Sequence, residues 1–132
     1  MENPSYGNSK NLGTIDFDTA LTNVTEALKE QGFGVLTEID VKATLKNKLD
    51  VPFRNYRILG ACNPPLAHQA LSAELSIGLL LPCNIVVYEN DDGTVTASAL
   101  NVQKLFQVVD NKPLAGLADQ VDVKLKAALD SL

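Results

Sequence analysis

The sequence predicts an α+β domain in which an antiparallel sheet is covered by helices on one face. Helical periodicity is strongest near the two ends of the chain, at residues 17–28 and 114–129, and residues with the character of strands gather between them. This distribution favours a two-layer arrangement of sheet and helices. The stretches that are typical of strands are 33–40, 56–62, 84–89 and 94–100.

Length and composition indicate one domain with a sizeable core. Of the 132 residues, 45% are apolar and 20% are charged, which is a globular balance. A domain of this length buries roughly two thirds of the surface that its unfolded chain exposes. We therefore expect a single domain over residues 1–132, in which the polar residues 1–8 are frayed.

In the first half of the chain, residues 9–15 are expected to form an edge strand. Asp16 is a predicted N-cap for the first long helix, which should end between Lys29 and Gly32. Residues 33–40 alternate as a strand does. Asp40 can then cap a short helix that runs to residue 49.

The second half begins with a predicted central strand at residues 56–62. Asn63 followed by Pro64 is typical of a helix start, and this helix should reach about residue 75. Pro82 interrupts the apolar run that follows, so we expect a clean strand only from residue 84. The elements expected after it are a strand at 84–89, a hairpin loop at 90–93, a strand at 94–100, a short helix capped by Asn101 and a last helix that starts at Pro113.

Charge and the start of the chain restrict location and partners. Eleven basic and sixteen acidic residues give a net charge of −5, which opposes nucleic acid and anionic membranes. The N-terminus has neither a basic region nor an apolar region of a signal peptide. We expect a cytoplasmic protein that binds neither nucleic acid nor membranes, with both cysteines as reduced thiols.

Two similar boxes contain the only two cysteines of the chain, each followed directly by asparagine. The boxes are Gly60-Ala61-Cys62-Asn63-Pro64 and Leu80-Leu81-Pro82-Cys83-Asn84, and the single histidine lies between them. Thiols, imidazole and amides are the groups that coordinate metals or bind small ligands. The candidate ligand-binding residues are therefore Cys62, Asn63, His68, Cys83 and Asn84.

The runs YRILGACNPPLAHQAL and IGLLLPCNIVVYE resemble a family known as domain of unknown function 302, DUF302. The resemblance is specific over about residues 32–89. It implies a β-α-β4-α order, with one curved sheet backed by two long helices, an architecture shared with the TATA-binding protein. It implies no biochemical activity, and a shared architecture does not transfer DNA binding.

Two functional interpretations follow from the boxes. The first is a small binding or interaction module with a pocket near the two Cys-Asn pairs, where the N-terminus of a helix would accept a small anionic ligand. The alternative is a thiol-dependent enzyme, or a redox or metal-binding protein, that uses Cys62 and Cys83 with His68 in support. Which cofactor or metal would be involved stays open.

Strand parity gives two further expectations. Cys83 alternates with Ile85 and should face the core, and Cys62, which shares the parity of Ile58, is expected to point into the same helix-covered layer. The opposite sheet face would then be unusually apolar, which predicts a homodimer through that face. The residues assigned to the dimer face are Leu36, Leu59, Ala61, Leu80, Val86 and Tyr88.

Overall fold

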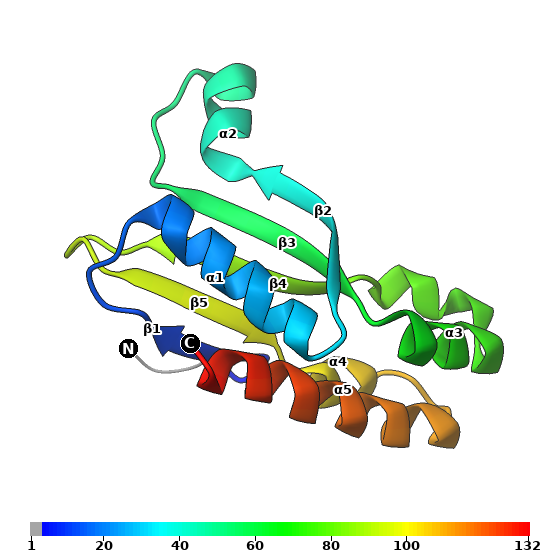
Figure 1. Ribbon diagram of the computed structural model, residues 1–132. Helices are drawn as coiled ribbons and strands as arrows, with labels where there is room; N and C mark the ends of the chain where they lie inside the picture. The colour runs from blue at the N-terminus through cyan, green and yellow to red at the C-terminus, as the bar shows by residue number, and fades with distance from the viewer. Residues whose placement is uncertain (1–3) are drawn as a thin grey trace.

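The structure is a computed structural model that describes residues 4–132. The elements follow in the order β1 (Gly7–Asn11), α1 (Phe17–Glu30), β2 (Gly34–Asp40), α2 (Val41–Leu49), β3 (Tyr56–Cys62), α3 (Pro64–Ala73), the 3₁₀ helix η1 (Leu75–Leu80), β4 (Cys83–Glu89), β5 (Val95–Leu100), α4 (Val102–Phe106) and α5 (Lys112–Asp130). The strands form one antiparallel sheet in the order β1-β5-β4-β3-β2 (Figure 1).

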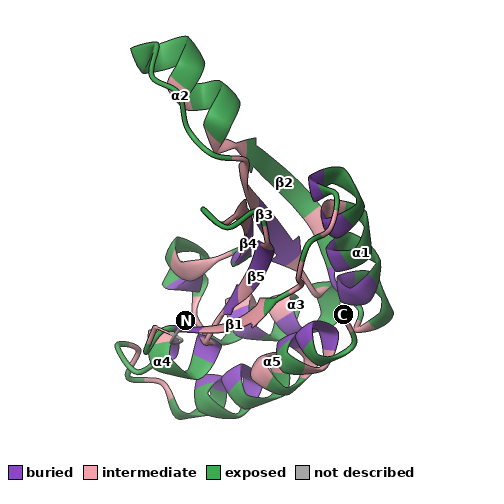
Figure 2. Ribbon diagram, turned by 90° about the vertical axis from the view of Figure 1, so that its left-hand side faces the viewer, coloured by how far each residue is buried: buried purple, intermediate pink, exposed green. Residues whose placement is uncertain are grey.

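Helices α1 and α5 cover one face of the sheet, and the apolar residues between the two layers form the core (Figures 1 and 2). This confirms the α+β class, and the long elements follow the β-α-β4-α order. No helix within residues 4–132 is long and apolar enough to cross a membrane. The largest fully buried side chains are Phe33, Leu59, Ile77, Ile85, Leu114, Val24, Val87, Val95 and Val102.

Local signals in the sequence set the ends of α1. The side chain of Asp16 accepts a hydrogen bond of 3.1 Å from the backbone N–H of Thr19, as an N-cap does. Beyond the helix, Gly32 adopts a φ of 86°, a conformation that glycine reaches without steric cost. The predicted start of this helix is confirmed, and its end lies within the expected window.

The first strand differs from its predicted position. It spans Gly7–Asn11 and pairs with β5, so residues 7 and 8, which were expected to be frayed, are ordered in the sheet. The expectation for residues 1–3 lies outside the described part of the chain. Pairing of an edge strand uses the backbone, so the polar side chains of β1 give little sign of it.

The face assigned to Leu59 and Ala61 was wrong. Leu59 lies opposite Ile85, and Ala61 lies opposite Cys83. Directly opposed residues of an antiparallel pair share a face, so both side chains point towards the helices, where they are 0% and 1% exposed. They cannot contribute to a contact through the other side of the sheet.

The other residues of the predicted dimer face do not all lie on one face of the sheet. Leu80 belongs to η1 and not to a strand, so its side chain does not follow the alternation of β4. The face away from α1 and α5, called the open face below, keeps Val86 and Tyr88, which lie opposite Ile58 and Tyr56 of β3.

Gly60 of β3 occupies a place where no side chain fits. A Cβ atom at this position would lie 2.1 Å from the Oγ1 atom of Thr37 and 2.7 Å from the Cγ atom of Pro82. Both distances are far below van der Waals contact. The absence of a side chain therefore lets β2 and the segment before β4 close over the end of β3.

We predict that Gly60→Ala lowers the free energy of unfolding by about 1–3 kcal/mol, the typical cost of overpacking. Gly34→Ala is the matched control, because a Cβ atom there meets nothing within 4 Å. The control should leave stability unchanged or raise it by up to about 1 kcal/mol, because alanine restricts the unfolded chain more than glycine does. Urea denaturation measures both values, and equal effects would contradict the steric account of Gly60.

Candidate functional site

Pairing between β3 and β4 brings the two boxes side by side. Ala61, in the first box, lies directly opposite Cys83 in the second. Because the strands are antiparallel, the end of β3 meets the beginning of β4, and α3 starts from the same place. The short boxes therefore occupy one end of the sheet.

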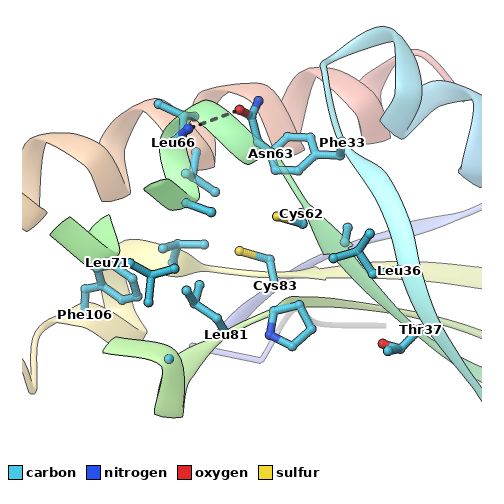
Figure 3. A pocket seen from close by; sticks show the side chains of 16 residues that line it. Phe33, Leu36, Thr37, Cys62, Asn63, Leu66, Leu71, Leu81, Cys83 and Phe106 are labelled. Atoms are coloured by element: carbon cyan, nitrogen blue, oxygen red, sulfur yellow. Dashed lines mark hydrogen bonds between the residues drawn. The ribbon is translucent and has the colours of Figure 1, made fainter. Parts of the chain in front are cut away.

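A cavity of about 350 Å³ lies at this end of the sheet (Figure 3). One side is formed by Phe33, Leu36 and Thr37, and α3 contributes Leu66, Ala67 and Leu71. The remaining wall comes from Leu81 and Pro82 before β4 and from Val102, Phe106 and Val121 of α4 and α5. Both thiols belong to the lining, and Figure 3 shows their sulfur atoms directed into the space.

The lining of this cavity is almost entirely apolar. Among the described residues, no charged side chain lines it, and its polar groups besides the two thiols are the Thr37 hydroxyl and the Asn63 amide. An apolar wall with few polar groups is typical of sites that bind small organic molecules. A charged ligand would lose its hydration here without gaining a countercharge.

The beginning of α3 has no free donor for an anion. Pro64 and Pro65 have no backbone N–H, and the N–H of Leu66 donates to the Asn63 side chain at 3.4 Å. The next N–H, of Ala67, donates to the Asn63 carbonyl at 2.9 Å. The predicted cap is thus confirmed, but it consumes the donors on which the expectation of an anionic ligand rested.

The structure brings Cys62, Asn63 and Cys83 together at the cavity, and it places His68 and Asn84 elsewhere. His68 lies on the exposed side of α3, because residues two positions apart on a helix, such as Leu66 and His68, point in nearly opposite directions. Asn84 follows Cys83 in β4, so it points to the other side of the sheet, where it is exposed. Within residues 4–132, no three His, Cys, Asp or Glu side chains are grouped to hold a metal ion.

The parity argument for Cys62 was also incorrect. Ile58 and Tyr56 of β3 belong to the open face, opposite Val86 and Tyr88, and alternation assigns Cys62 to that face as well. Cys62 is nevertheless the last residue of β3, and its side chain lies at the end of the sheet, where it lines the cavity. The two thiols therefore lie close together, as expected. The reason is the position of Cys62 at the end of the sheet and not the predicted parity of β3.

Burial controls the chemistry of Cys83. Burial in apolar surroundings, with smaller contributions from the nearby Cys62 and the Asp122 carboxylate, raises the pKa of its thiol to about 11. The thiolate is the reactive form of cysteine, so this side chain is protonated and unreactive at neutral pH. Both cysteines are free thiols in the structure.

Sequence reasoning did not find the wall that α4 and α5 contribute. The carboxylate of Asp122 in α5 accepts hydrogen bonds from the backbone N–H groups of Val102, at 2.6 Å, and Gln103, at 2.9 Å. These two bonds hold the first turn of α4 against α5 and so position Val102 and Phe106 at the cavity. The partners are about 20 residues apart in the chain, and no local pattern indicates their contact.

We predict that wild type is more stable to unfolding than Cys83→Ala by an amount that depends on pH. The folded protein raises the pKa from about 9 to about 11, so the neutral thiol stabilises the fold fully below pH 9 and loses this contribution as the pH rises to 11. The loss should amount to roughly 2–3 kcal/mol. Urea denaturation of wild type and Cys83→Ala at several pH values measures it.

The stability advantage of wild type over Cys83→Ala is the informative quantity, because every other ionisable group is common to both proteins. It should shrink between pH 9 and pH 11. An advantage that stays constant over this range would show that the thiol has an ordinary pKa in the folded protein.

Comparison with known proteins places the fold in a family. The family model described as "Domain of unknown function DUF302" matches residues 9–132, a wider range than the 32–89 that the boxes indicated. No curated protein matches the chain. Among solved structures, it is similar to the crystal structure of an uncharacterized conserved DUF302 protein from Bacillus stearothermophilus, with a TM-score of 0.87 and 28% identity over 96% of this chain and 98% of that chain. The chain is a member of the DUF302 family.

Proposed function

We propose that this domain is a binding module that takes a small, uncharged, apolar molecule into the cavity between the two Cys-Asn boxes. The observation that carries the proposal is a cavity of about 350 Å³ without a charged side chain in its wall. An apolar cavity of about 150 Å³ accommodates one benzene ring, so this one, with more than twice that volume, has room for roughly two to three fused or linked rings. Its volume lies at the lower end of the range for ligand sites.

The thiols fit this proposal as part of the apolar wall. A protonated cysteine behaves as a small, polarizable, hydrophobic group that packs against rings and hydrocarbon. The raised pKa of Cys83 and the position of His68 outside the cavity favour binding over the alternative of thiol catalysis. Redox or metal chemistry at Cys83 would need a thiolate that burial disfavours.

We predict that N-phenyl-1-naphthylamine, an uncharged apolar fluorophore, binds saturably with one site per chain. Ala67→Phe should weaken its binding by about tenfold or more, because the phenyl group enters the cavity from α3. Ala73→Phe is the matched control: it lies on the same helix, is exposed, and does not line the cavity. Fluorescence titration gives the dissociation constants.

A further variant and a competition experiment distinguish an apolar ligand from thiol chemistry and from an anionic ligand. Cys62→Ser should still bind the fluorophore, and inorganic phosphate should not displace it, if the ligand is apolar and uncharged. Displacement by phosphate would favour the anionic ligand. Equal binding by the Ala67→Phe and Ala73→Phe proteins would place the fluorophore outside the cavity and contradict the proposal.

A further inference from the structure

The segment 41–55, formed by α2 and the loop after it and called the arm below, projects from the end of β2 and β3 (Figures 1 and 2). None of the residues of α2 is buried, and Figure 2 shows the helix as almost wholly exposed. Three apolar side chains of the arm, Leu49, Val51 and Phe53, are also exposed. The arm thus presents apolar surface that nothing in the described part of the chain covers.

A helix of this kind needs more than its own sequence to be stable. Helices shorter than about 12–15 residues are marginal in water unless they pack against something, and α2 has nine residues. Its ends are well defined, because the Asp40 side chain accepts a hydrogen bond of 3.0 Å from Ala43 N–H and Lys46 forms an ion pair with Asp50. These exposed contacts contribute little, so a covering surface is expected to supply the missing burial.

The charge of the arm is opposite to that of the rest of the molecule. The arm contains four of the eleven basic residues and one acidic residue, which gives it a net charge of +3 and leaves −8 on the remainder. One chain therefore carries both a basic arm and an acidic remainder. A second copy of the same chain satisfies this pattern without any other partner.

The exposed surface of the arm continues onto the open face of the sheet. The ring of Phe53 lies 6.2 Å from that of Tyr56, and the Tyr56 ring is stacked on Tyr88 at 5.4 Å. Beyond these rings the open face carries Ile58 and Val86, which are opposed and half-buried. The arm and the open face form one continuous surface, which a two-fold axis can match to itself.

We propose that two copies of this chain form a dimer in which the arm of each copy lies against the open sheet face of the other. The apolar side chains of the arm then meet the apolar part of the partner's open face, and the lysines of the arm lie near the partner's acidic body. The dimer is independent of the proposed ligand, because the residues that carry it are not those that line the cavity.

Light scattering coupled to size-exclusion chromatography tests the dimer at 20 μM protein in 50 mM NaCl. The wild type should have twice the chain mass of 14.2 kDa. Leu49→Asp should give the monomer mass and a native circular dichroism spectrum. Val123→Asp on α5 is the control, because Val123 is 68% exposed and Leu49 67%, and this variant should remain a dimer.

Charge reversal provides a second variant. Lys42→Glu with Lys48→Glu should raise the dimer dissociation constant about tenfold or more at 50 mM NaCl, and by less at 500 mM, because salt screens exposed charges. A wild type with the monomer mass would overturn the proposal, as would equal masses for Leu49→Asp and Val123→Asp. A monomeric wild type that binds a DNA or RNA oligonucleotide through the arm would assign the arm to nucleic acid instead.

Discussion

Ala61 of β3 lies directly opposite Cys83 of β4, and the rest of the candidate site depends on this register. It brings together two boxes whose cysteines are 21 positions apart in the sequence. Gly60 makes the arrangement possible, because the place of its missing side chain is occupied by Thr37 and Pro82. Apolar side chains of α3 and α4 complete the wall of the cavity beside this close approach.

Much of the fold could be predicted because its signals are local. The caps at Asp16 and Asn63 act within three residues of themselves, and the helices begin where these side chains indicate. The buried face of β3 could not be assigned with the same certainty, because Ile58 and Leu59 are both apolar and alternation favours neither side. Only the pairing with β4 and the helices above it decide that Leu59 is the buried one.

The candidate site could likewise be predicted only in part. The repeated Cys-Asn pairs located Cys62, Asn63 and Cys83 at the cavity, whereas proximity in sequence was misleading for His68 and Asn84, which the geometry of α3 and β4 turns away. The wall formed by α4 and α5 depends on long-range contacts such as the bond between Asp122 and the start of α4. The apolar character of the cavity, which supports the proposal of an uncharged ligand, therefore emerges only in three dimensions.

We propose that the apolar cavity built by this register takes up an uncharged molecule. Methyl NMR spectra recorded during a titration with N-phenyl-1-naphthylamine test it most directly, because each methyl group reports its own surroundings. We predict that the methyl signals of Leu66, Leu71 and Val102 shift progressively, while those of Val86 and Val123 stay in place. Shifts confined to Val86 on the open face, or to Val123 on α5, with no change at the cavity would contradict it.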